Sequence, residues 1–487
     1  MSSFIYKPFV TMDVDQEPVH VDIFIAINHF NQCVMDGNFR EIIRLLDDGY
    51  NVNFFDATGL TALHHAVNQG NMHLIKFLLE KGANITARTF SGVSVMMFVV
   101  MAGNVEIFDF FAAKFASRSE PVPLDSMCHV NSRGETLLML ACSHGHPHMV
   151  QRLIQVGFDP WHVDESGQTS LHHSVPREGG RFTIPPDRER GVILVLLKST
   201  TPSLEFINTK DYDGNTALHK ACRINNDTLK FGSLSNFLYP HRPIRYNVPL
   251  DREAVVKILL VHGASILLPN SKLETALHIA VTNSANCNFV ATLCHAGANS
   301  GAQDEKGRTP FHIAMSMTHQ HDPGDLHNFN SLSCIQTMCA SDKGFNESYF
   351  KIRDHQGMTP RLVAYKSRNY DAARWERLSP RYFYNDDTDI NGDGPLHYTV
   401  RTHAMDEVRW LLNHGANIHA RNMAGMSPSD IADSYLGGEC KSLFDGIYQE
   451  TQNRSLSLAM GHHRRLGATS ILTELSPELL RDVHKYM

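Results

Sequence analysis

The sequence lacks any run of about 18 uncharged apolar residues, the length that a membrane-spanning helix needs. Its first ten residues, MSSFIYKPFV, lack the apolar core of a secretory signal. The net charge of -7 over 487 residues is small, so it indicates no general attraction to nucleic acid or to membrane surfaces. We therefore expect a protein with neither nucleic-acid nor membrane partners.

Cysteine is also sparse and shows no pairing pattern. The nine cysteines are scattered, odd in number and without CxxC spacing. This favours reduced thiols over a disulfide framework and predicts a cytoplasmic or nuclear location. The chain also has no GxxxxGK[ST], GxSxG or HExxH motif. These observations predict a non-catalytic protein without a cofactor.

One histidine-rich segment leaves an enzymatic alternative open. His319, His321, Asp322, Asp325 and His327 place nitrogen and oxygen donors close together in sequence, a set that suits zinc or nickel. A flexible loop would not hold these donors in a fixed arrangement, so we predict no metal here. Bound metal in the purified protein would favour the enzymatic alternative.

The sequence does contain a repeated phrase, Asp-x-x-Gly-x-Thr-x-Leu-His. Nearly intact copies are DATGLTALH from Asp56, DESGQTSLH from Asp164, DYDGNTALH from Asp211 and DEKGRTPFH from Asp304. Degraded copies begin at Thr89, Asn131, Asn270, Asp354, Asp389 and Asn422. Five of the nine intervals between copies are 33 to 35 residues, and the other four fit the same unit with an insertion. A period of this length indicates one supersecondary unit that is copied and stacked.

Each position of the phrase has a structural role. Glycine in the fourth position suits a turn that needs positive φ, and threonine in the sixth can cap the helix that follows. Histidine in the ninth position is expected to bridge backbone groups of neighbouring turns. A second apolar helix is predicted by IKFLLEKGA from Ile75, VKILLVHGA from Val256 and VRWLLNHGA from Val408, each ended by glycine.

In this pattern the chain resembles the ankyrin-repeat family, whose period is about 33 residues with a turn and two helices per unit. The resemblance covers roughly residues 23–450. It implies a mainly α solenoid of stacked helix-turn-helix units with hairpin turns and long inter-helix insertions. We expect an N-terminal arm at 1–22, a capping repeat at 23–55, an array of about ten units at 56–450 and a C-terminal tail at 451–487.

Insertions and turn tips are the candidate partner-binding sites. The insertions are predicted at 116–127, 176–191, 227–251 and 319–330. Their arginines would suit a partner with carboxylates or phosphates, although the same segments could simply be tolerated surface loops. These arginines are Arg181, Arg188, Arg190, Arg242 and Arg245. At the turn tips, Phe55, Phe90 and Tyr212 are expected to contact a protein partner. The predicted function is a non-catalytic scaffold for protein–protein interaction.

The tail suggests an alternative function. ILTELSPELLRDVHKYM from Ile471 resembles the opening of an F-box, although Ser476 stands where that pattern often has an apolar residue. The resemblance implies an arrangement like that of pox-type ankyrin adaptors, which recruit a Skp1–cullin ubiquitin ligase. A Skp1-like partner would then contact Leu475, Pro477, Leu479 and Leu480. The other interpretation is that these leucines cap the exposed end of the solenoid.

The predicted second helices give a test of the stacking. Leu259→Ala or Leu411→Ala should lower the free energy of unfolding by about 2–5 kcal/mol, because each leucine is expected to lie between stacked helices. Urea titration of both variants measures this loss. A decrease well under about 1 kcal/mol would place these leucines outside the core.

Overall fold

The structure is a computed structural model that describes residues 29–116, 130–175, 186–199, 203–223, 252–282, 287–317, 331–342, 345–374, 387–414 and 416–434, with scattered positions between 442 and 453. Within these ranges every regular element is a helix, apart from the isolated β-bridges Phe55–Thr61 and Arg88–Ser94. The predicted mainly helical stack of paired helices is confirmed. The arm at 1–22 and nearly all of the tail at 451–487 lie outside the described residues.

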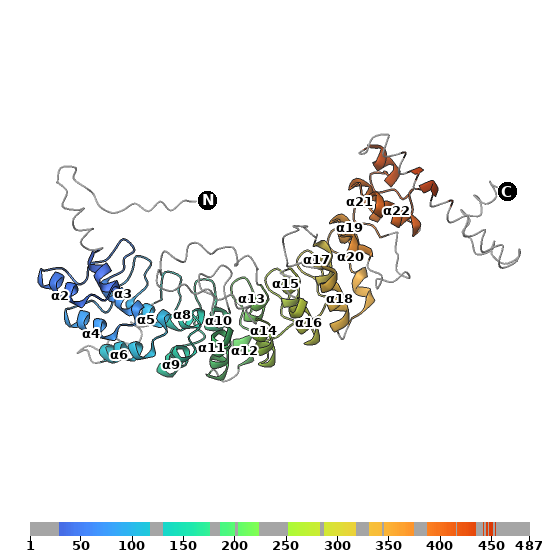
Figure 1. Cartoon of the computed structure of the whole chain (residues 1–487). Coiled ribbons are helices and arrows are strands. Elements are labelled where there is room, and N and C mark those ends of the chain that lie inside the picture. The colour runs from blue at the N-terminus through green and yellow to red at the C-terminus, as the bar shows by residue number, and fades with distance from the viewer. Residues whose placement is uncertain are drawn as a thin grey trace, which may run out of the picture. The chain divides into compact units, whose positions relative to one another are not determined.

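The chain divides into two units, each with its own set of helix pairs. The first comprises Met1–Tyr212 and Thr228–Gly263, and the second comprises Asp213–Asp227 and Ala264–Met487. In both units a helix that follows a turn packs against the next helix of the same repeat and against the equivalent helix of the neighbouring repeat (Figure 1).

The first unit begins with a helix at 29–35 and α2 (Phe39–Asp47), which correspond to the predicted capping repeat. The helices that follow turns stack in the order α3, α5, α8 and α10, and α6, α9, α11 and α14 form a parallel row. The bounds are α3 Ala62–Gln69, α4 Met72–Glu80, α5 Val95–Ala102, α6 Val105–Ala116, α8 Leu137–Ser143, α9 Pro147–Val156, α10 Ser170–Ser174, α11 Pro186–Ser199, α12 Leu204–Ile207 and α14 Arg252–Val261.

The second unit repeats this arrangement. Its first row is α13, α15, α17, α19 and α21, and α16, α18 and α20 stack as the second row. The bounds are α13 Ala217–Cys222, α15 Ala276–Thr282, α16 Cys287–His295, α17 Pro310–Ser316, α18 Ser331–Ser341, η2 Glu347–Lys351, α19 Pro360–Lys366, α20 Tyr370–Arg374, α21 Pro395–Arg401 and α22 Met405–Asn413.

The core lies between the two helices of each repeat and between neighbouring repeats. Leu259 in α14 is 0% exposed and Leu411 in α22 is 1% exposed, as their place in the repeat predicts. The first helices contribute a stripe of small and large residues, such as Leu63 and Ala66 in α3, both fully or nearly fully buried. Because a short two-helix unit cannot cover its own apolar face, each repeat depends on its neighbours for burial.

One predicted loop boundary is wrong. The sequence predicts an insertion between two helices at 176–191, but α11 already begins at Pro186. Proline is favoured in the first turn of a helix, where its missing N–H has no helical partner to lose. Arg188 and Arg190 therefore lie in a helix, whereas 227–251 and 319–330 lie outside the described residues.

Six cysteines are free thiols; Cys339 is partly exposed, and the buried ones are Cys33, Cys142, Cys222, Cys294 and Cys334. In the described part of the chain, no helix combines the length and the hydrophobicity that a membrane crossing would require.

Turn glycines hold neighbouring repeats close together. Gly214 has φ of +76°, and a Cβ at this position would stand 2.5 Å from the backbone nitrogen of Ser271 in the next turn. Gly425 occupies the same repeat position with φ of +75° and has nothing within 4 Å of such a Cβ. In a third copy Leu273 takes the glycine position with φ of 57°, so the turn persists there with a strained leucine.

This pair of glycines separates backbone strain from crowding. Gly425→Ala should lower the free energy of unfolding by about 1–2 kcal/mol, because an L-residue is disfavoured at positive φ. Gly214→Ala should cost clearly more, since the Ser271 turn must also move. Urea unfolding followed by circular dichroism measures both losses. Equal losses would show that the close approach of the two turns does not contribute.

Candidate functional site

The turn tips are built by the first residue of each repeat phrase. In the first full copy, Asp56 Oδ1 accepts hydrogen bonds from the backbone N–H of Thr58 at 2.8 Å and of Leu60 at 3.0 Å. Asn131, Asp164, Asn270, Asp304, Asp354, Asp389 and Asn422 close their turns in the same way. An acidic or amide side chain thus satisfies two backbone donors and fixes the shape of the tip.

Neighbouring tips are also joined by backbone hydrogen bonds. The residue after the turn-closing Asp or Asn donates its N–H to the carbonyl oxygen of the third residue of the preceding phrase. In the first unit Glu165 donates to Arg133 and Tyr212 donates to Ser166, each at 3.1 Å. In the second unit the donor–acceptor pairs are Ser271–Asp213, Glu305–Lys272, His355–Lys306, Ile390–Gln356 and Met423–Asn391, at 2.8–3.0 Å. The tips that begin at Asn131, Asp164 and Asp211 in the first unit, and those of the second unit, are therefore fixed relative to their neighbours within each unit.

Two phenylalanines of the first unit lie exposed on adjacent tips. Phe55 is 54% exposed and Phe90 is 61% exposed. Their ring centroids are 5.4 Å apart at an interplanar angle of 83°, an edge-to-face arrangement. We call these two residues the aromatic tip pair. Tyr212, the third predicted contact residue, is 73% exposed and packs its ring over Gly167.

The predicted arginine contacts are only partly within the described residues. Arg188 is exposed in α11, and Arg190 pairs with Asp187 at 2.6 Å in the same helix. Arg181, Arg242 and Arg245 lie outside the described residues, as do Leu475, Pro477, Leu479 and Leu480 of the tail. The histidine-rich segment from His319 to His327 also lies outside them.

Sequence reasoning missed further exposed apolar tips. Ile390 is 56% exposed and Met423 is 82% exposed. Both stand in the second position of their phrase, which is also the position of Phe90 and Tyr212. Applying the repeat register to the degraded copies would have found them.

The repeat histidines are structural. The backbone N–H of the helix-capping residue Thr309 donates to His312 Nδ1 at 3.0 Å, so the ring proton is on Nε2. Nε2–H then donates to the carbonyl oxygen of Met358 in the next turn at 3.0 Å. His219, His278 and His397 make the same bridge to Glu274, Arg308 and Met426. The predicted bridging role is confirmed for these four histidines, but it is wrong for His64, whose buried Nε2 has no hydrogen-bond partner.

Burial of these imidazoles favours their neutral form. It lowers the pKa of His278, His312 and His397 from the ordinary value. Burial lowers the pKa of His64 to about 4, and its ring meets that of Phe98 in a T-shaped arrangement with centroids 5.1 Å apart.

Comparisons with known proteins agree with the observed repeats. A family model described as "Ankyrin repeats (3 copies)" matches residues 30–119 and 96–182, and one described as "Ankyrin repeat" matches 391–423. None of these three matches reaches the tail at 451–487.

Curated relatives match only parts of the chain. A B-cell lymphoma 3 protein homolog of Mus musculus is 29% identical over 58% of this chain and 54% of its own length. Rabankyrin-5 of Mus musculus is 30% identical over 30% of this chain and 11% of its length. A transient receptor potential cation channel subfamily A member 1 homolog of Caenorhabditis elegans is 27% identical over 42% of this chain and 16% of its own length. The matched region thus spans about half of the first relative and far less of the others.

The histidine pKa values predict how stability depends on pH. Because the folded-state pKa is below the unfolded value of about 6.5, the unfolded chain binds protons first as the pH falls. The free energy of unfolding should therefore be highest above about pH 7 and decrease between about pH 6.5 and 4. Urea midpoints at pH 7.5 and 5.0 measure the decrease, and His312→Asn should reduce it. An unchanged midpoint in the wild type would contradict the burial of neutral imidazoles.

Proposed function

We propose that this chain is an ankyrin-repeat protein that acts as a non-catalytic scaffold whose turn tips bind another protein. The observation that carries the proposal is the aromatic tip pair, two exposed phenylalanine rings in contact with each other on adjacent turns. Large apolar side chains that stay in water at the end of a fixed turn favour a partner that covers them.

The geometry of the pair suits a binding anchor. Aromatic residues are enriched at the centre of protein interfaces, where a few of them supply most of the binding energy. The Phe55 turn is closed by Asp56, and the Phe90 backbone approaches Gly59 so closely that a Cβ there would stand 2.6 Å from the Phe90 nitrogen. Because both turns are already fixed, binding loses little conformational entropy.

The chemistry of the partner follows from these side chains. An apolar segment would cover the aromatic tip pair. We expect the partner to be a protein of the cytosol or nucleus, because buried free thiols are typical of a reducing compartment. The relatives differ widely in name, so they do not indicate which protein it is.

A double variant tests the tips directly. Phe55→Ser with Phe90→Ser should reduce the capture of partner proteins at least about tenfold, because the apolar anchors are lost while the turns remain closed. Tagged full-length protein would be used to enrich partners from cell extract, with quantification by mass spectrometry and affinity measurement on the purified partner.

Met423→Ser is the matched control, since Met423 is a strongly exposed apolar tip of the second unit. It should leave the partners of the aromatic tip pair bound. Unchanged circular dichroism of both variants checks the fold. The proposal fails if the double variant and the control retain the same partners with the same affinity.

The tail supports a finer alternative, a substrate-recruiting adaptor of a Skp1–cullin-type ubiquitin ligase. Its support is the leucine-proline pattern that includes Leu475, Pro477 and Leu479. A chain ending at Glu450 should keep the partners of the tips and lose a Skp1-like protein. If the full-length chain never enriches such a protein, the adaptor function is excluded.

A further inference from the structure

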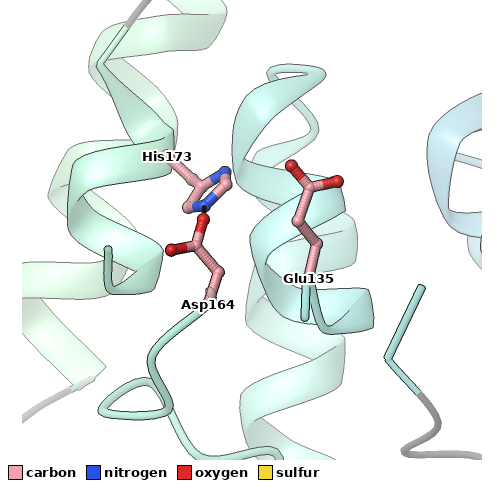
Figure 2. Close-up of side chains that lie close together, drawn as sticks. All are labelled: Glu135, Asp164 and His173. Atoms are coloured by element: carbon pink, nitrogen blue, oxygen red, sulfur yellow. Dashed lines mark hydrogen bonds and ion pairs between the residues drawn. The ribbon is translucent and has the colours of Figure 1, made fainter. Parts of the chain in front are cut away.

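Three buried side chains with metal-binding chemistry meet between two consecutive repeats of the first unit. Glu135 precedes α8, Asp164 begins the next turn and His173 lies in α10 (Figure 2). A carboxylate oxygen of each acid and a ring nitrogen of the histidine lie within 4.8 Å of one another. Among the described residues, no other set of three or more histidine, cysteine, aspartate or glutamate side chains brings its ligand atoms this close together. Glu135 and Asp164 are each 6% exposed and His173 is 1% exposed.

Hydrogen bonds already orient the three ligands. Asp164 Oδ1 accepts the backbone N–H groups of Ser166 and Gln168, and Asp164 Oδ2 is 2.8 Å from His173 Nε2. Glu135 Oε2 accepts from Asn131 Nδ2 at 2.7 Å. The bonds from Asn131 and from the two backbone N–H groups are outer contacts that would hold the acids in position, whereas the Asp164–His173 bond would give way to the metal.

Other repeats of this chain contain parts of the cluster but not the whole. Asp56 and His65 form the same acid–imidazole pair, with Oδ2 and Nε2 3.1 Å apart, and belong to no group of three ligands among the described residues. Glu274 and Asp304 stand at the repeat positions of Glu135 and Asp164, so two carboxylates occur there again. In that pair, however, Arg308 bonds to Asp304 Oδ2 at 2.7 Å. In the described part of the chain, both acids and an imidazole come together only at the boundary between the repeat that contains Glu135 and the repeat that contains Asp164 and His173.

The charges and donors suit a divalent transition metal. Asp164 and His173 already form a buried pair, with Oδ2 and Nε2 2.8 Å apart. A divalent cation would take the place of the shared proton and bind the unprotonated imidazole together with the carboxylates. One nitrogen and two oxygen ligands with a fourth position for water match zinc, whose ligand bonds are about 2.0–2.2 Å long.

We propose that Glu135, Asp164 and His173 form a Zn²⁺ site that joins two consecutive repeats. In a tetrahedral site with bonds of this length the ligand atoms stand about 3.3 Å apart. His173 and Asp164 are already at this range, so the Glu135 side chain moves toward them on binding. Because the ligands come from two repeats, the metal resists separation of the α8 and α10 helices and stabilises the folded chain.

The test measures zinc binding to the full-length chain after chelator treatment. Isothermal titration with ZnCl₂ should give one more equivalent in the wild type than in Glu135→Gln or His173→Gln. Glutamine at 135 keeps an oxygen that can accept from Asn131, so the packing is retained. Zn²⁺ should also raise the thermal midpoint of the wild type by several degrees more than that of Glu135→Gln, and Co²⁺ should show tetrahedral visible absorption in the wild type alone.

Two variants control for zinc held by other histidines. His65→Gln removes the imidazole of the equivalent pair, and Glu274→Gln removes the equivalent acid beside Asp304; both should keep the wild-type stoichiometry. Metal-free circular dichroism and thermal midpoints show that each variant is folded. The site does not exist if the wild type and folded Glu135→Gln bind the same number of zinc ions and show the same thermal shift.

Discussion

In the second unit, the hydrogen bond from a repeat imidazole to the backbone of the next turn is the constraint on which the stack depends. His312 accepts from its own capping threonine through Nδ1 and donates to Met358 through Nε2, so one side chain satisfies buried groups of two repeats. A buried polar group without a partner costs about 1–3 kcal/mol, which makes a shifted register unfavourable. The same bridge recurs at His219, His278 and His397. Apolar burial drives the helices together, and these bonds fix how they align.

The register set by this bond also determines the surface. The turns are held at a constant spacing. The second residue of a repeat phrase donates its backbone N–H to a carbonyl oxygen of the preceding tip, while its side chain remains available to solvent. That position carries Tyr212, Ile390 and Met423, all exposed. Exposed apolar side chains at this position cost the fold little, because the tip is held by its backbone. Binding surfaces can therefore vary in sequence without loss of the stack.

A junction between repeats also brings together residues that are distant in sequence. Glu135 lies 38 positions before His173, and neither residue departs from what its own repeat tolerates. Elsewhere the same acid positions are neutralised by Arg308 or occupied by amides, as at Asn215 and Asn270, which are joined at 3.1 Å. The framework can thus hold a structural polar network in one junction and a group of metal ligands in another.

The sequence by itself determined the turn, the helix cap, the bridging histidine and the leucine core, because each depends on contacts within one repeat or on a rule that every repeat obeys. Gly214, Thr309, His312 and Leu259 could all be assigned a role from spacing alone. Only the tertiary structure decided that α11 starts at Pro186, that Leu273 keeps a turn at positive φ, and that Phe55 touches Phe90. It also placed Glu135 beside Asp164 and His173. The Phe55–Phe90 contact and the Glu135 cluster arise from contacts between repeats, whose distances no local pattern encodes.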